Sequence, residues 1–193
     1  MSEPYHRFVF RDGKLIGDFE SMYQAERSEG FDSWHQDDLA LRPEIVNLVR
    51  SREFESVIDI GCGKGALLSE VRAGRVVGVD ISPTALQTAR RRLPNAEFRC
   101  RDALTAAGAG EHFDLVMLVT VLYYIPQWRR VLELAAAIGN WLMVAAYVPR
   151  ETTGTIESIA VLREAVEGLF SIEEEIGDGE AWVALARTKR PPR

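Results

Sequence analysis

The stretch that decides the fold is Val57-Ile58-Asp59-Ile60-Gly61-Cys62-Gly63-Lys64-Gly65. An apolar run leads directly into a glycine-rich turn, and an acid stands two residues before the first glycine. Glycines at alternate positions allow a sharp turn and let the backbone approach a ligand that a Cβ would exclude. The stretch therefore predicts a buried strand that ends at a ligand-binding turn.

A second apolar run follows over residues 75–80 and ends at Asp80. Neighbouring parallel strands end at the same edge of a sheet, so we expect Asp80 beside the glycine turn. An acid in that place can accept hydrogen bonds from both hydroxyls of a ribose. Because Gly61-x-Gly63-x-x-Ala66 also fits a dinucleotide fingerprint, a nicotinamide enzyme is an alternative at this point.

Strands and helices alternate along the rest of the chain. Predicted strands cover residues 56–60, 75–80, 97–101, 113–119 and 141–148. Predicted helices cover residues 18–27, 34–50, 65–72, 126–138 and 155–168, and one more begins with Ser82 as N-cap and Pro83 in its first turn. This order predicts an α/β fold with a doubly wound, mainly parallel seven-stranded sheet.

The two ends of the chain complete this prediction. Runs at 169–176 and 181–188 flank Gly177-Asp178-Gly179, which is a strong signal for an antiparallel C-terminal hairpin. Residues 1–50 are expected to form an N-terminal helical cap or lid. Residues 51–193 are expected to form one compact ligand-binding domain.

Composition narrows the class of protein. The chain has 193 residues, of which 47% are hydrophobic and 27% charged, as in an ordinary globular domain. It lacks both a signal-peptide pattern and an apolar run near the roughly 20 residues that a membrane span needs, so we expect a cytoplasmic protein without membrane contact. The net charge of −6 argues against nucleic-acid binding. Metal-ligand spacing is also missing from the sequence, so we expect no metal.

Together these motifs resemble the class I S-adenosylmethionine-dependent methyltransferases over about residues 50–188. The resemblance rests on residues 57–65, the strand ending at Asp80, the step Asp102-Ala103, and Phe113-Asp114-Leu115-Val116. It implies a Rossmann-like methyltransferase fold, with S-adenosyl-L-methionine as cofactor and S-adenosyl-L-homocysteine as product. The cofactor-binding residues that it implies are Asp59, Gly61, Cys62, Gly63, Gly65, Asp80, Ile81, Asp102, Ala103 and Val119, with Tyr23 and Trp34 from the cap.

Several of these residues also have plain structural interpretations. Asp59 could cap a turn, Asp80 could anchor the helix that begins at Ser82, and Asp102 could be a solvated strand end. Asp114 begins a strand and is expected to be structural. Lys64 is expected to be a solvated loop residue.

A finer resemblance concerns residues 119–125, which read V-T-V-L-Y-Y-I. They are similar to the S-E-V-L-Y-Y-L stretch of small-molecule methyltransferases such as the nodulation N-methyltransferases and their thiopurine-methyltransferase-like relatives. Residues 18–23 and 31–35 are similar to the acidic-aromatic segment that precedes the domain in that group. Thr120 replaces the common Glu of the group, and Ser33 replaces its Pro.

The acceptor pocket is predicted between the cap and the far strand ends. Tyr23, Trp34 and His35 would form one wall, and His35 is the candidate base, although packing is its alternative role. The opposite wall would comprise Tyr123, Tyr124, Tyr147 and Arg150. Such a lid excludes water from a reaction.

We therefore expect methyl transfer to a hydroxyl or amine of a small molecule, a saccharide or a secondary metabolite, by a monomer or homodimer. No Asn/Asp-Pro-Pro-Tyr motif follows residues 113–119, which disfavours a nucleobase or protein-amide acceptor. A cofactor-binding regulatory or scaffolding protein without transferase activity stays open as the alternative.

Overall fold

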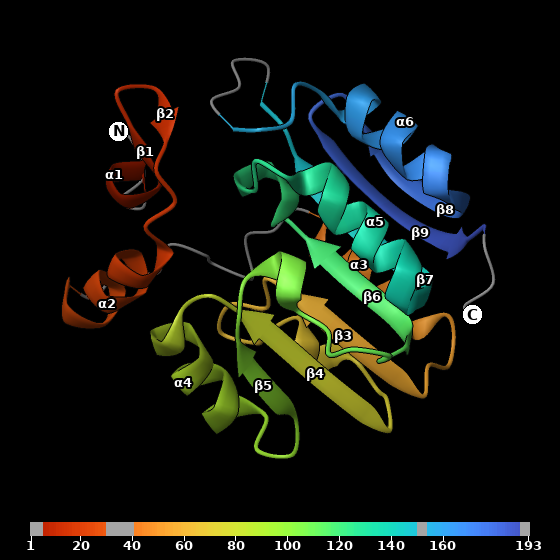
Figure 1. Ribbon diagram of the computed structural model, residues 1–193, viewed down its shortest axis with the longest axis horizontal. Helices are drawn as coiled ribbons and strands as arrows, with labels where there is room; N and C mark the ends of the chain where they lie inside the picture. Colours follow the sequence, from red (N-terminus) through yellow and green to blue (C-terminus); the bar gives the residue numbers. More distant parts are fainter. Residues whose placement is uncertain (1–5, 30–40, 150–153, 190–193) are drawn as a thin grey trace.

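The computed structural model describes residues 6–29, 41–149 and 154–189. Its centre is a seven-stranded sheet in the order β5-β4-β3-β6-β7-β9-β8 (Figure 1). The strands are β3 (Ser56–Ile60), β4 (Arg75–Asp80), β5 (Glu97–Cys100), β6 (Phe113–Val119), β7 (Gly139–Tyr147), β8 (Phe170–Asp178) and β9 (Ala181–Thr188). All pairs from β5 to β7 are parallel, whereas β9 runs antiparallel to both β7 and β8. The predicted fold class, including the C-terminal hairpin, is confirmed.

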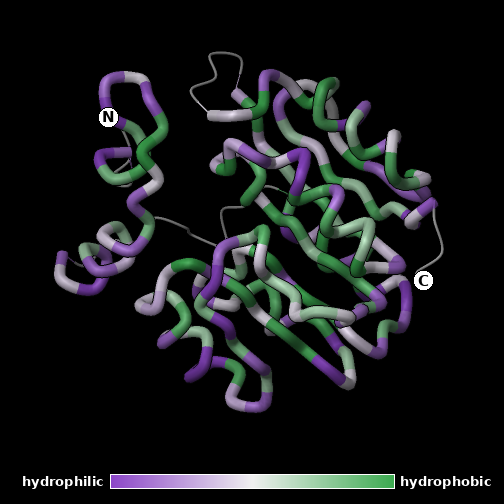
Figure 2. The backbone as a smooth tube through the Cα atoms, in the orientation of Figure 1, coloured by the Kyte–Doolittle hydropathy of each residue, from purple (hydrophilic) through white to green (hydrophobic). Residues whose placement is uncertain are grey.

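Helices cover both faces of this sheet because its central strands are apolar on both sides. The helices are α3 (Arg42–Arg50), α4 (Pro83–Arg92), α5 (Trp128–Ile138) and α6 (Ile159–Leu169). In β6, Val116 and Leu118 pack with α5 and α6, while Leu115 and Met117 pack with α3. This division explains the unbroken apolar run, since a strand covered on both faces needs no polar alternation. Figure 2 shows the hydrophobic residues gathered in these central strands.

A small N-terminal segment stands apart from the sheet. It contains α1 (His6–Val9), β1 (Phe10–Arg11), β2 (Lys14–Leu15) and α2 (Phe19–Glu29). In Figure 1 it lies on the side toward which the arrowheads of β4 and β6 point. Helix α2 agrees with the helix predicted over 18–27. The hairpin of β1 and β2 was not predicted, although Asp12 and Gly13 both have positive φ angles, 49° and 70°, as a two-residue hairpin turn requires.

The prediction of a helix over residues 65–72 is wrong. Only a 3₁₀ turn, η1 (Leu68–Glu70), forms there. The Ser69 hydroxyl donates to the carbonyl of Ala66 at 2.6 Å, and the Arg50 guanidinium donates to the carbonyl of Glu70 at 3.2 Å. These contacts compete with helical hydrogen bonding. The helix predicted over 34–50 is present as α3, and its first part falls outside the described residues.

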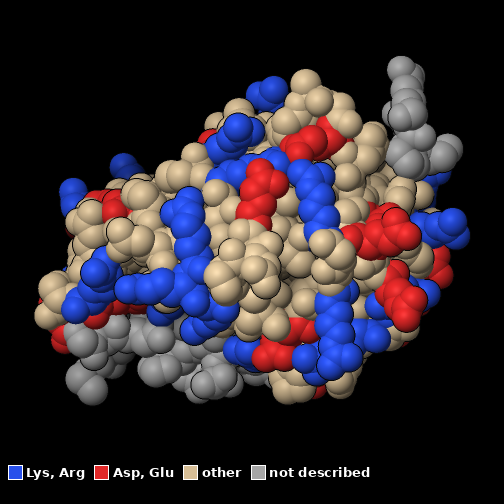
Figure 3. All heavy atoms as spheres, turned by 90° about the horizontal axis from the view of Figure 1, so that it is seen from below, with Lys and Arg blue, Asp and Glu red and all other residues tan. Residues whose placement is uncertain are grey.

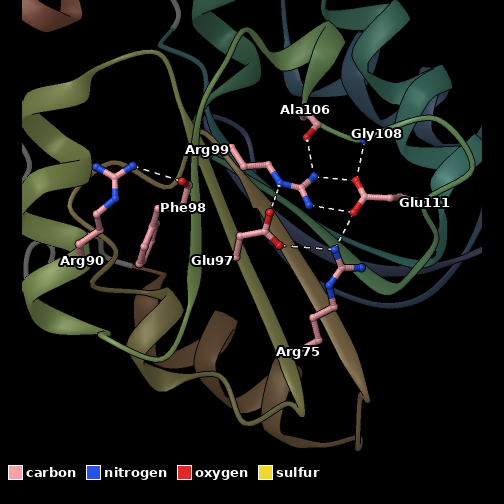
Figure 4. A network of polar contacts seen from close by, with 8 residues as sticks. All are labelled: Arg75, Arg90, Glu97, Phe98, Arg99, Ala106, Gly108 and Glu111. Carbon is pink, nitrogen blue, oxygen red and sulfur yellow. Dashed lines mark hydrogen bonds and ion pairs between the residues drawn. The ribbon is translucent and has the colours of Figure 1, made fainter.

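One charged network of arginine and glutamate side chains ties neighbouring segments together at the β5 edge of the sheet. The guanidinium of Arg99 pairs with both carboxylate oxygens of Glu111, at 2.6 and 2.8 Å, and with Glu97 at 2.7 Å (Figure 4). Arg75 also reaches Glu111, at 2.5 Å. The network joins β4 and β5 to the loop before β6. Basic and acidic side chains lie interspersed on the face drawn in Figure 3.

Asp114 has the structural role expected of it. Its carboxylate accepts hydrogen bonds from the backbone N–H groups of Glu55 and Ser56, at 2.9 and 3.0 Å, and from the amide of Asn140. These contacts align the starts of β3, β6 and β7.

Among the helices of the described ranges, none is both long and apolar enough to cross a membrane. The division of the chain at residue 50 stays a prediction.

Candidate functional site

A cavity of about 1200 Å³ lies at the carboxyl ends of the parallel strands. This is where open parallel sheets bind ligands. The predicted site residues that line it are Tyr23, Asp59, Gly61, Cys62, Gly63, Asp80, Ile81, Asp102, Ala103, Val119, Tyr123, Tyr124 and Tyr147. Gly65 is not part of the lining. Trp34, His35 and Arg150 fall outside the described residues.

The glycine turn after β3 adopts the conformation that only glycine takes easily. Gly61, Gly63 and Gly65 have φ angles of +83°, +50° and +70°. A Cβ at Gly61 would collide with the side chain of Val121, and one at Gly63 would stand 2.8 Å from the Tyr23 hydroxyl. Gly65 instead faces α4, because its Cβ would stand 3.1 Å from that of Ala89. Thus the first two glycines shape the cavity and the third packs the turn.

Asp80 is held at the edge of the cavity by two backbone donors. One carboxylate oxygen accepts from the N–H of Gly63 and the other from the N–H of Ser82, both at 2.9 Å. Asp80 therefore does anchor the start of α4, as its structural alternative required. A carboxylate offers about four acceptor positions, so it also has capacity for ribose hydroxyls. Burial raises the pKa of Asp80, against the opposing effect of these hydrogen bonds.

Asp59 is a buried acid whose negative charge is not compensated by any described residue. Asp59 is only 3% exposed, and no described residue donates a hydrogen bond to its carboxylate. Burial first, and then the charge of Asp80, raise its pKa to about 7. A buried carboxylate of this kind is stabilised by a cation. The ammonium and sulfonium groups of S-adenosylmethionine would supply positive charge, so the residues present fit this cofactor.

Asp102 lies at the end of β5 beside Ala103. One of its carboxylate oxygens accepts from the N–H of Leu104 at 2.8 Å and so caps the 3₁₀ turn η2 (Ala103–Thr105). The side chain is exposed and faces the cavity, as does neighbouring Ile81, which is 48% exposed. Asp102 therefore caps η2, and its contact with an adenine stays a prediction.

The end of β6 carries an unusual backbone conformation. Thr120 has a φ angle of +54°, which is rare for a β-branched residue. Its N–H donates to the carbonyl of Ala145 at 2.8 Å, which holds the strained residue in place. Both Val119 and Thr120 line the cavity. The sequence indicated the replacement of Glu by Thr120 but gave no sign of the strain.

An aromatic cluster forms the remaining wall. Tyr124 contacts Tyr123 and Phe19 edge to face, with ring centroids 5.3 and 5.4 Å apart, and Phe10 lies 6.2 Å away. Phe10 and Phe19 come from the N-terminal segment and were not predicted as site residues. The missed Asp12-Gly13 turn was the available signal, since it folds this segment back over the cavity.

Two tyrosines of the predicted acceptor wall are fixed by hydrogen bonds. The Tyr123 hydroxyl accepts from the N–H of Gly154 at 2.9 Å. The Tyr147 hydroxyl donates to Glu180 at 2.9 Å, which raises the pKa of Tyr147.

Within the described ranges, no group of three or more His, Cys, Asp or Glu side chains is placed so that it could hold a metal ion.

Comparison with protein families gives one match over residues 57–154, to a family described as a methyltransferase domain. Trans-aconitate 2-methyltransferase of Variovorax paradoxus is 32% identical over 111 residues, which cover 55% of this chain and 43% of that enzyme. The dTDP-4-amino-2,3,4,6-tetradeoxy-D-glucose N,N-dimethyltransferase of Saccharopolyspora spinosa is 31% identical over 121 residues, 58% of this chain and 47% of that enzyme. The chain thus spans about half the length of the curated relatives it matches.

Among solved structures, the N-methyltransferase NodS of Bradyrhizobium japonicum WM9, in complex with S-adenosyl-L-homocysteine, is similar with a TM-score of 0.74. The match covers 87% of this chain and 98% of NodS at 20% sequence identity. At that identity the likeness is evidence about the fold. It agrees with the Rossmann-like sheet described above.

Proposed function

This chain belongs to the methyltransferase-domain family, and we propose that it transfers the methyl group of S-adenosyl-L-methionine to a hydroxyl or amine of a small molecule. The observation that carries the proposal is the pair of carboxylates at the glycine turn. Asp59 is buried without a described partner, and Asp80 stands at the end of the next strand; both face one cavity of about 1200 Å³.

The chain's own residues would hold the cofactor from its two ends. Asp80 would accept from the ribose hydroxyls, and Asp102 and Ala103 would bind the adenine edge. Asp59 and the carbonyl of Val119 would face the ammonium group. When bound, the cofactor supplies a methyl group already activated on a sulfonium, so alignment of the acceptor would be the protein's main contribution, worth about 7–11 kcal/mol.

The acceptor would lie against the aromatic cluster of Phe10, Phe19, Tyr123 and Tyr124. A cavity of about 1200 Å³ is large enough for a cofactor together with a small acceptor. An amino sugar is the acceptor named for the Saccharopolyspora relative, which supports a saccharide. The aromatic wall suits the ring of a sugar or of a secondary metabolite. His35 stays the proposed base for a hydroxyl or protonated amine.

The test is a transfer assay with S-adenosylmethionine carrying a radiolabelled methyl group. Wild-type protein would be incubated with amino sugars, phenols and small amines, and Asp80→Ala would serve as the matched control. We expect label on at least one class of acceptor with wild type and, at a limiting concentration of cofactor, much less label with the variant. Binding of S-adenosylhomocysteine without transfer to any class would favour the scaffolding alternative.

Three further points belong to the same proposal. We propose that the protein acts in the cytoplasm, that it is a monomer or homodimer, and that it has neither nucleic-acid nor membrane partners. The net charge of −6 supports the absence of a nucleic-acid partner. Size-exclusion chromatography with light scattering would measure the oligomeric state.

A further inference from the structure

Helix α2 presents one side to the two loops that surround Asp80. Glu20, Tyr23 and Glu26 follow one another at intervals of three residues, so they lie on one broad side of the helix, within about 120° of one another. Met22 and Tyr23 pack with Ala85 of α4 in a small apolar cluster. This packing seats the helix, and it leaves the two glutamates to make polar contacts with the loops.

Glu20 holds the loop that follows Asp80. Its carboxylate accepts from the Ser82 hydroxyl at 2.5 Å and from the Thr84 hydroxyl and N–H at 2.6 and 3.2 Å. Burial raises the pKa of Glu20, but the hydrogen bonds from Ser82 and Thr84 outweigh it, and the net shift is downward. An ionised Glu20 therefore sits at the N-terminus of α4, where the helix dipole favours negative charge.

Glu26 holds the glycine turn. Its carboxylate pairs with the Lys64 ammonium at 3.2 Å, and the two side chains are only 6% and 15% exposed. The expectation that Lys64 is a solvated loop residue is therefore wrong. Its neighbour Gly63 lies under the Tyr23 hydroxyl, which adds a second contact between α2 and the turn.

The two loops meet at the carboxylate of Asp80. The N–H of Ser82 donates to one oxygen and the N–H of Gly63 to the other, each at 2.9 Å. Each donor thus belongs to a segment that one glutamate of α2 holds. Neither glutamate lines the cavity, so neither contacts a ligand there. They act on Asp80 through the two loops and, for Glu20, also through its charge, which adds to the effect of burial in raising the pKa of Asp80.

We propose that Glu20 and Glu26 are positioning residues that orient the Asp80 carboxylate for the ribose hydroxyls of the cofactor. The ribose assignment rests on the proposed function, whereas the bracing of Asp80 by α2 does not. Losing either glutamate frees one of the two loops, so the Asp80 carboxylate samples orientations in which it misses the hydroxyls. Affinity for the cofactor then falls although no contact with the cofactor has been removed.

The first arm of the test measures ligand binding by calorimetry. The variants are Glu20→Gln and Glu26→Gln, and the matched control is Glu29→Gln, a residue of α2 that is 50% exposed and pairs with Arg7. The ligands are S-adenosylhomocysteine and its 2′,3′-dideoxy analogue, which cannot donate to Asp80. We expect about tenfold weaker binding of S-adenosylhomocysteine in both variants, a change below about twofold for the analogue, and no change in the control.

The second arm needs no ligand. Amide hydrogen exchange is measured at Gly63 and Ser82 in the unliganded protein. Glu26→Gln should accelerate exchange at Gly63, and Glu20→Gln should accelerate it at Ser82, while the control changes neither. If Glu26→Gln folds poorly, the double variant Glu26→Gln/Lys64→Met removes both buried charges together and should still show fast exchange at Gly63.

The outcomes separate this proposal from the proposed function. Unchanged exchange at both amides overturns the bracing role, as does an equal loss of affinity for both ligands, which would indicate general loosening of α2. If wild type instead fails to bind S-adenosylhomocysteine while the variants show the expected acceleration of exchange, the cofactor assignment and the ribose role of Asp80 are wrong. The positioning of the two loops by Glu20 and Glu26 is then still supported.

Discussion

The buried carboxylate of Asp59 leads to a quantitative prediction for Asp59→Asn. The pKa of this acid is raised from 3.8 to about 7, first by burial and then by Asp80. Between these values the folded protein keeps a proton that the unfolded chain has lost. Stability from this group is therefore complete below about pH 4 and is lost as the pH rises through about 7.

The size of the effect follows from the shift in pKa. At about 1.4 kcal/mol per pKa unit, ionisation of Asp59 lowers the free energy of unfolding by at most about 4 kcal/mol, nearly all of it by pH 8. At pH 5 the loss is about 2 kcal/mol. Asparagine has nearly the same shape and does not ionise. Unliganded Asp59→Asn should therefore be more stable than wild type, with a larger difference at pH 8 than at pH 5.

Urea denaturation of both proteins at pH 5 and pH 8 measures this difference. The same variant should bind S-adenosylhomocysteine more weakly, since it lacks the charge that would face the ammonium group. Binding to wild type near pH 6.5 should release protons, which calorimetry in buffers of different ionisation enthalpy detects. A variant that is no more stable than wild type at pH 8 would refute the assignment of a costly buried charge at Asp59.

Three other substitutions test neighbouring parts of the site. Asp80→Ala should weaken binding of S-adenosylhomocysteine by about 1.5–3 kcal/mol in calorimetry, the usual worth of hydrogen bonds to a charged group. Gly63→Val should abolish binding. Because φ is +50° at this position and the Tyr23 hydroxyl is close, it should also lower the free energy of unfolding by about 1–3 kcal/mol. Preserved binding would mean that the turn serves packing only. Thr120→Gly should raise the melting temperature, since it relieves about 1–2 kcal/mol of backbone strain, and an unchanged or lower value would contradict the strain argument.

The fold could be predicted because its decisive signals are local. The apolar run into Gly61, the acid at Asp80 and the glycine-rich stretch 177–179, which leads into the hairpin turn between β8 and β9, each depend on a few adjacent residues. These gave the sheet, its hairpin and the position of the site, and the family match over 57–154 confirms the family that they indicated. The helix predicted over 65–72 failed because long-range contacts from Arg50 compete there with helical bonding.

The parts that were missed depend on tertiary contacts. The Lys64–Glu26 pair joins residues far apart in the sequence, and only the packing of α2 on α4 brings them together. The strain at Thr120 exists because the surrounding strands hold it, which no local propensity records. The N-terminal hairpin has strands of two residues each, too short for a periodic pattern to reveal.

The central claim is that the cavity beside Asp80 binds S-adenosylmethionine and not a nicotinamide dinucleotide. Calorimetric titration of the full chain with S-adenosylhomocysteine and, separately, with NAD⁺ tests it most directly. The account predicts binding of one S-adenosylhomocysteine per chain and no heat of binding with NAD⁺. Binding of NAD⁺, or saturating amounts of S-adenosylhomocysteine without any binding heat or thermal stabilisation, would contradict it.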